Sequence, residues 1–202
     1  PYLALEFVEA GPARGDSDER LGRDLAELHR FGAPSFGHRC DNFVGSLSQT
    51  GASCDTWPEF YATKRLDPLV RRAIDAGSLP AAFATDFDRL YARLAQLCGP
   101  AEPPARLHGD LWSGNAMCSR SGEPVLIDPA VYGGHREIDL AMMRLFGGFS
   151  ARCFAAYDEV FPFAPEFDDR VPLYQLYPLL VHVNLFGGSY VGQLRRALNT
   201  QL

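Results

Sequence analysis

Apolar residues return every three or four positions over most of the chain, which is the spacing of helices with one buried face. From Asp18 this spacing predicts an amphipathic helix that ends near Gly32 and Pro34. Helical spacing returns over residues 57–76 and again over 83–97. After a central stretch of different character, further helices are expected over residues 138–146, 154–160, about 171–186 and 190–199.

Short extended segments interrupt this helical pattern. Residues 2–8 mix aromatic and aliphatic side chains and stop at a Gly-Pro pair, which predicts a strand that runs into a loop. Residues 107–108 and 125–127 are also typical of strands, and Ser121-Gly122 predicts a hairpin turn. Residues 33–56 are rich in turn-forming residues without a sustained period, so a long irregular loop is expected. The predicted fold class is α+β and mostly helical, with a few short strands.

Composition then narrows the class of protein. The chain has 202 residues, 47% of them hydrophobic and 22% charged, which suits one globular domain with a sizeable core. Its net charge is −6 and no block of like charges interrupts it, so we expect no nucleic-acid partner and no membrane partner. The longest apolar stretch, residues 177–185, is broken by polar residues and is shorter than the ~20 residues of a spanning helix.

Cysteine and histidine spacing shows no metal site. The five cysteines are odd in number and unclustered, so we expect reduced thiols in a cytoplasmic protein. Away from residue 108, the histidines lie far apart and are expected at the surface or in the core with satisfied hydrogen bonds; they are His29, His38, His135 and His182. The chain opens at Pro1 without a signal-peptide profile, which suggests a piece cut from a longer protein.

The chemistry is concentrated in His108 to Asn115 (HGDLWSGN), followed thirteen residues later by Asp128. This spacing matches the phosphotransferase loop H-x-D-L-x-x-x-N and the metal-binding Asp that follows it. Asp110 is the candidate catalytic base that accepts the proton of the acceptor hydroxyl, while Asn115 and Asp128 are candidate ligands of Mg²⁺ and ATP. Any one of these residues alone is more simply a cap or an Asx-turn, but their joint spacing favours phosphoryl transfer.

The motif and the segments around it resemble the fructosamine kinase (ketosamine kinase) family, within the aminoglycoside-phosphotransferase-like kinases. The resemblance extends from residues 21–30 (LGRDLAELHR) and 41–46 (DNFVGS) through residues 57–66 and 124–149 to residues 177–192. It implies the C-terminal lobe of a protein-kinase-like fold, with the short strands around the catalytic loop. Residues 1–10 would be the last strand of the N-terminal lobe and the hinge, and residues 11–202 the helical catalytic lobe.

The resemblance also assigns supporting residues. The backbone of Glu6, Phe7 and Val8 would read the adenine edge of ATP, and Asp139 would hold the catalytic-loop backbone. His108 is expected to shape the loop rather than act as a base. Trp112 is either a platform for a sugar face or a core side chain. Four residues are candidates for the acceptor pocket on the resemblance only: Arg136, Glu137, His182 and Asn184.

The predicted function is ATP-dependent phosphorylation of a sugar hydroxyl of a ketosamine, free or on protein lysines, as a repair of glycation. One alternative is a kinase of the same fold that acts on an aminoglycoside, choline or another alcohol, because the loop constrains the acceptor poorly. The other is an inactive fragment or interaction module. Because the phosphate-clamping groups of an N-terminal lobe are absent, the chain alone is expected to be inactive and to self-associate through its exposed first strand.

Overall fold

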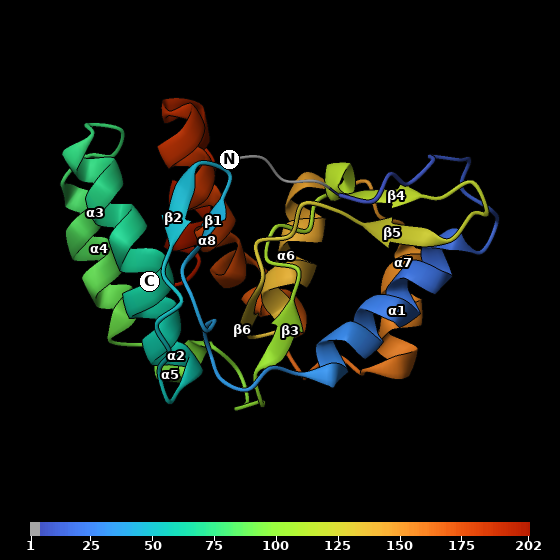
Figure 1. Cartoon of the computed structure of the whole chain (residues 1–202). Coiled ribbons are helices and arrows are strands. Elements are labelled where there is room, and N and C mark those ends of the chain that lie inside the picture. Colours follow the sequence, from blue (N-terminus) through green and yellow to red (C-terminus); the bar gives the residue numbers. More distant parts are fainter. Residues whose placement is uncertain (1–4) are drawn as a thin grey trace.

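The computed structural model describes residues 5–202, and helices form most of it (Figure 1). The helices of the first half are α1 (Ser17–Phe31), α2 (Trp57–Phe60), a π-helical segment (Tyr61–Leu66), α3 (Asp67–Asp75), α4 (Ala82–Tyr91) and α5 (Leu94–Leu97). Those of the second half are α6 (Glu137–Phe146), α7 (Ala151–Val160), α8 (Phe167–Phe186) and α9 (Val191–Asn199), with short 3₁₀ turns at Ser113–Asn115 and Gly188–Tyr190. Each helix expected from the apolar spacing is present, and the expected fold class is confirmed. Within residues 5–202, no helix is long and apolar enough to cross a membrane.

Within residues 5–202 the strands form three antiparallel pairs, and each strand is three residues long. The pairs are β1 (Asn42–Val44) with β2 (Leu47–Gln49), β3 (Ala105–Leu107) with β6 (Tyr132–Gly134), and β4 (Ala116–Cys118) with β5 (Pro124–Leu126). The turn expected at Ser121-Gly122 joins β4 to β5, and the Gly122 N–H donates to the Ser119 carbonyl at 2.8 Å. The pair β3–β6 lies in the middle of the molecule and leads directly into the loop that carries the chemistry (Figure 1).

Helices α1 and α8 each pack against several elements around the strand pair β3–β6. Helix α1 lies against α7 and β3, while α8 contacts α3, α6 and α9. Gly22 permits the close approach of α1 and α7, because a Cβ atom there would lie 2.1 Å from the carbonyl oxygen of Cys153. Helix α8 has buried residues on all sides, as a helix in the centre of a core must. The α1–α7 part and the α3–α8 part therefore lie on opposite sides of β3 and β6 (Figure 1).

Three expectations about strands were wrong or incomplete. Residues 33–56 are not wholly irregular, since they contain the β1–β2 hairpin, and the strand β6 was not expected at all. Both errors have one cause: a three-residue strand is too short to show a period of two. Residues 5–8 form no strand, and Leu5 and Phe7 are 71% and 87% exposed, because no neighbouring strand pairs with them in the described part of the chain. Residues 2–4 of that expected strand lie outside the described residues, and the division at residue 10 stays a prediction.

Candidate active site

The loop His108–Asn115 starts at the end of β3 and is held by a glycine and a buried leucine. Gly109 has φ +84°, and a Cβ atom there would lie 2.1 Å from the carbonyl oxygen of Ala130. Only glycine accommodates both conditions, which explains why this loop has Gly between His108 and Asp110. The Leu111 side chain is fully buried and anchors the middle of the loop in the core.

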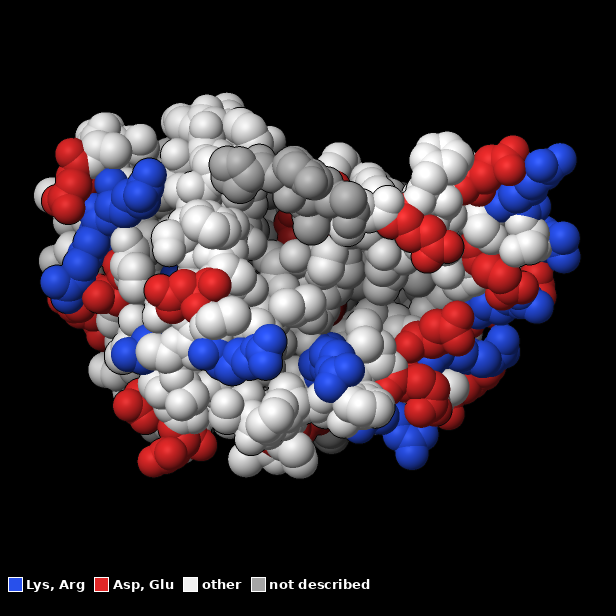
Figure 2. All heavy atoms as spheres, viewed as in Figure 1, with Lys and Arg blue, Asp and Glu red and all other residues white. Residues whose placement is uncertain are grey.

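The structure brings Asp110, Asn115 and Asp128 to one place. The Asn115 side-chain amide donates to the Asp110 carbonyl at 2.9 Å and to its carboxylate at 3.2 Å. The Asn115 carbonyl accepts from the N–H of Ile127 at 3.0 Å, so the next residue, Asp128, follows beside it. Asp128 has φ +50°, a conformation that a residue other than glycine adopts only when its surroundings impose it. The face containing this loop is hollowed between the β1–β2 part and the β4–β5 part (Figure 2).

Asp110 is half-buried, and this burial affects its titration. Burial raises the pKa of the Asp110 carboxyl above its ordinary value, while His108, the hydrogen bond from Asn115 and His182 act in the opposite direction. A carboxylate with a raised pKa is a better proton acceptor than one in water. The position therefore suits a general base for an incoming hydroxyl.

Two oxygen donors beside Asp110 fit a hard cation. The Asn115 amide nitrogen is used toward Asp110, which leaves its oxygen without a hydrogen bond among residues 5–202. The Asp128 carboxylate is exposed and likewise makes no hydrogen bond with a described residue. Across the same residues no group of three His, Cys, Asp or Glu side chains could hold a metal by itself. Two ligands suit Mg²⁺, which is normally shared between one or two protein oxygens and substrate phosphates.

Asp139, on α6, holds the start of the loop from behind. Its carboxylate accepts from the N–H of His108 at 2.7 Å and from that of Gly109 at 2.9 Å, and its side chain is fully buried. Burial by itself would raise the pKa of Asp139, but the hydrogen bond and charge of His29 outweigh it and lower that pKa. The carboxylate is thus kept ionised under the catalytic loop.

Sequence reasoning missed the two residues that support Asp139. The Nε2 atom of His29 lies 3.1 Å from the Asp139 carboxylate, and its Nδ1 atom lies 2.8 Å from the Tyr157 hydroxyl. A signal for His29 was present, because it continues the spacing of four from Leu21 and Leu25 on the apolar face of α1. Tyr157 gave no such signal, since its role depends on the packing of α7 against α1.

His108 contacts loop backbone. Its Nε2 atom lies 2.9 Å from the Ile127 carbonyl oxygen, and its Nδ1 atom accepts weakly from the Asp110 N–H at 3.3 Å. The imidazole therefore joins the catalytic loop to the segment that carries Asp128. This is the geometry of a residue that shapes the loop, and its ring nitrogens are occupied by those contacts.

Of the acceptor candidates, Trp112 is exposed and His182 is half-buried. The Trp112 side chain is 43% exposed, and its ring passes so close to Gly114 that a Cβ atom there would lie 2.2 Å from it. Of the two interpretations left open for Trp112, this exposure favours the platform for a sugar. His182, on α8, lowers the pKa of the Asp110 carboxyl. The centroids of the His182 and Phe146 rings lie 4.7 Å apart.

Three other acceptor candidates make their polar contacts within the protein. Arg136 is buried and forms an ion pair with Glu102 at 2.9 Å, and Glu137 is buried in an ion pair with Arg170 at 2.6 Å. A buried charge needs a partner, and Arg136 and Glu137 both have theirs inside the protein, so these contacts give no support to the expectation that they bind the acceptor. Asn184 donates to the Leu69 and Leu180 carbonyls at 3.1 and 2.8 Å, and thus ties α8 to α3.

Glu6, Phe7 and Val8 lie just before the point where the chain joins the β4–β5 hairpin. Ala10 forms a bridge with Ser119, and the Glu9 carbonyl accepts from the Arg120 N–H at 2.9 Å. Within the described residues the backbone of residues 6–8 makes no hydrogen bond to another backbone group. Its carbonyl and amide groups are thus available, and their contact with adenine stays a prediction.

The arrangement of helices and short strands around the loop is that of the helical lobe of a protein-kinase-like fold. The family model of fructosamine kinase matches residues 1–202, and the chain belongs to the fructosamine kinase family. It is 43% identical to a curated ketoamine kinase of Synechocystis sp., over 98% of this chain and 66% of that protein. It is 38% identical to the protein-ribulosamine 3-kinase of Arabidopsis thaliana chloroplasts, over 94% of this chain and 58% of that protein.

Solved structures agree with this family assignment. A crystal structure described as a fructosamine-3-kinase from Thermobifida fusca superposes with a TM-score of 0.92 at 44% identity, covering 97% of this chain and 68% of that one. The resemblance found in the sequence is thereby confirmed for family and fold. The chain spans about two thirds or less of the length of these relatives.

Proposed function

We propose that the protein transfers the γ-phosphoryl group of ATP to a sugar hydroxyl of a ketosamine, a sugar–amine adduct that is free or attached to a protein lysine. One observation supports this above all: Asn115 donates to the Asp110 carboxylate while its backbone pairs with Ile127, beside Asp128. A base for the hydroxyl and two oxygen ligands for a cation lie in one place, as phosphoryl transfer requires.

Each residue of the site has a separate task. Asp110 accepts the proton of the sugar hydroxyl as that oxygen bonds to phosphorus, and Asn115 fixes the Asp110 carboxylate by its hydrogen bond. Asn115 and Asp128 would hold Mg²⁺, which when bound neutralises charge on the phosphates. Asp139 keeps the backbone of His108 and Gly109 in place, so the base does not have to be reoriented for each turnover.

The acceptor class rests on Trp112 and on the names of the relatives. An exposed indole offers an apolar face on which a sugar ring can stack, and His182 lowers the pKa of the Asp110 carboxyl. The names ketoamine kinase and protein-ribulosamine 3-kinase belong to two relatives and favour a ketosamine over an aminoglycoside or choline. All five cysteines are free thiols, which suits the reducing cytoplasm in which we place the protein.

The test is a substrate panel with the full-length protein. It is incubated with Mg-ATP and ribulose-, erythrulose- and fructose-lysine, beside kanamycin and choline, and ADP release is followed. We expect turnover with at least one lysine adduct and none with kanamycin or choline. The Asp110→Asn variant serves as the control for contaminating kinases. Turnover of choline or kanamycin alone would replace ketosamines with another acceptor class.

A further inference from the structure

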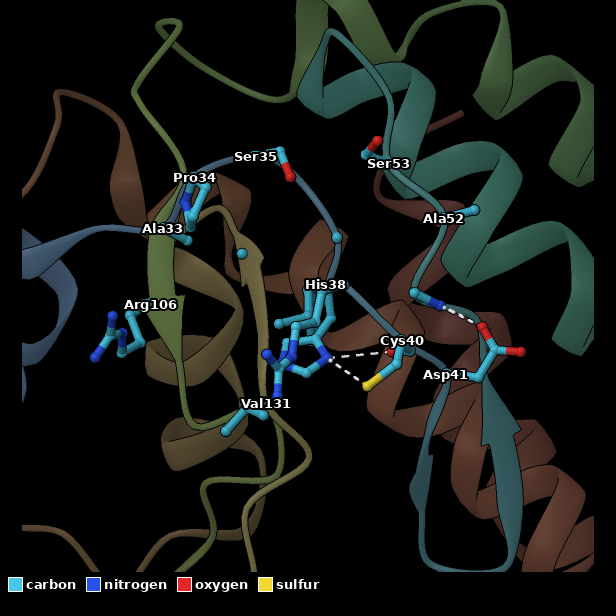
Figure 3. A pocket seen from close by; sticks show the side chains of 15 residues that line it. Ala33, Pro34, Ser35, His38, Cys40, Asp41, Ala52, Ser53, Arg106 and Val131 are labelled. Atoms are coloured by element: carbon cyan, nitrogen blue, oxygen red, sulfur yellow. Dashed lines mark hydrogen bonds between the residues drawn. The ribbon is translucent and has the colours of Figure 1, made fainter.

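A second hollow lies next to the active site, on the outer side of β3 and β6. Its volume is about 740 Å³, and it is bounded by residues 33–41, residues 51–53, Arg106 and residues 131–133. Figure 3 shows Arg106 on β3 at one side and Asp41, Ala52 and Ser53 at the other, with His38 and Cys40 between them. We call this hollow the arginine pocket, after Arg39 and Arg106. Nothing in the proposed reaction uses it.

Two guanidinium groups give the arginine pocket positive charge. Arg39 and Arg106 are exposed, and neither forms an ion pair with a residue of the described chain. Arg106 instead lies over the ring of Phe31 at 4.1 Å, and that ring is 73% exposed. Lys and Arg side chains stand against a mostly uncharged surface in the lower middle of this face (Figure 2).

Among the described residues that line the arginine pocket, Asp41 is the one with an acidic side chain. The Asp41 carboxylate accepts from the N–H of Gly51 at 2.9 Å and lies 3.5 Å from the Thr50 hydroxyl. It therefore holds residues 50–51 against residue 41 and forms no ion pair with Arg39 or Arg106. Its charge offsets one of the two guanidinium charges, so the lining of the pocket keeps one net positive charge. Charge complementarity then favours an anionic occupant.

One wall of the arginine pocket is in contact with the catalytic loop. Val131 lines the pocket, and Asn42 donates to its carbonyl at 2.8 Å. The preceding residue, Ala130, donates its N–H to the His108 carbonyl at 2.9 Å and packs directly against Gly109. A molecule in the pocket is thus separated from the loop that carries Asp110 by a single layer of backbone.

We propose that the arginine pocket binds an acidic segment of the polypeptide whose lysine carries the ketosamine. This rests on the proposed function and adds the partner to it. A free ketosamine is small enough to be held at Trp112 alone, whereas a protein-bound one brings neighbouring residues that must lie on this face. Two unpaired guanidiniums and the exposed Phe31 ring suit carboxylates and apolar side chains of such a segment. A nucleic acid is disfavoured by the net charge of −6.

The experiment compares two substrates of the full-length enzyme. One is ribulosyl-lysine, and the other is an acidic peptide with a single ribulosylated lysine. The variant Arg39→Glu/Arg106→Glu is compared with Arg72→Glu, which reverses an exposed and unpaired charge on α3, away from the pocket (Figure 1). We expect kcat/KM for the peptide to fall about tenfold in the double variant and to stay within about twofold for ribulosyl-lysine. Arg72→Glu should leave both values unchanged.

Binding of the unglycated acidic peptide, followed by fluorescence anisotropy, separates the two hypotheses. If the wild type binds this peptide through the two arginines but phosphorylates neither substrate, the proposed function fails and the docking surface stands. If both substrates are phosphorylated and the double variant changes them equally or not at all, the docking surface is refuted. An acidic polypeptide would also be refuted as the occupant by either of two results. One is an equal fall of kcat/KM in the double variant for a basic ribulosylated peptide. The other is an equal loss of binding in the double variant for an RNA used as competitor of the acidic peptide.

Discussion

Replacement of Asp139 by Asn tests whether the catalytic loop is held from behind. The carboxylate accepts three hydrogen bonds in a fully buried position, from the N–H groups of His108 and Gly109 and from His29. An Asn side chain has the same shape but only one acceptor oxygen. Its amide group would face a backbone N–H, so one donor is left without a partner and the remaining bonds lose their ionic component.

The magnitude follows from these contacts. An unsatisfied buried donor costs about 1–3 kcal/mol, and the lost ionic component of the other bonds adds about 1 kcal/mol. Asp139→Asn should therefore lower the free energy of unfolding by about 3 kcal/mol and lower Tm by several degrees. Because the loop would shift, kcat should fall about 10–100-fold even though Asp139 does not contact substrate.

The assay is thermal unfolding of the full-length enzyme followed by circular dichroism, together with steady-state kinetics. Tyr157→Phe removes only the hydroxyl near His29 and should cost about 1 kcal/mol. Asp24→Asn is the matched control, an exposed carboxylate on α1 whose loss should change stability by less than about 0.5 kcal/mol. If Asp139→Asn behaved like Asp24→Asn, the support of the loop by Asp139 would be wrong.

Three further predictions concern the base, the cation site and a buried histidine. Asp110→Asn should reduce kcat by about 10²–10⁴ and leave ATP affinity nearly unchanged, so an unchanged kcat would remove Asp110 from the base role. Asp128→Ala should weaken Mg-nucleotide binding more than Asn115→Ala, which calorimetry can measure, because only Asp128 adds negative charge. Burial, with Arg136 and Arg170 nearby, lowers the pKa of His135 to about 3, so the unfolded chain alone takes up this proton below pH ~6.5. The free energy of unfolding should therefore fall by up to about 5 kcal/mol as pH drops from ~6.5 toward 3. Urea unfolding of His135→Gln should show a shallower fall than the wild type, and an equal fall would contradict the prediction for His135.

The sequence alone was sufficient for the family, the fold class and the loop. Helices such as α1 and α6 carry their own signal, because a buried face repeats with the helical period whatever it packs against. The loop was equally visible, since the spacing of Asp110, Asn115 and Asp128 matches the phosphotransferase motif in the sequence itself. The reason for Gly109 came only from the structure, where its φ of +84° and the nearby Ala130 carbonyl exclude other residues.

Only the tertiary structure decided which polar residues face the site and which face the core. Arg136 and Glu137 stand close to the motif in sequence, yet each is buried against a partner brought from elsewhere in the chain, Glu102 or Arg170. His29 and Tyr157 were not assigned to the site and lie beneath it, because α1 and α7 pack together. Burial and pairing depend on contacts between residues far apart in sequence, and the local pattern carries no record of those contacts.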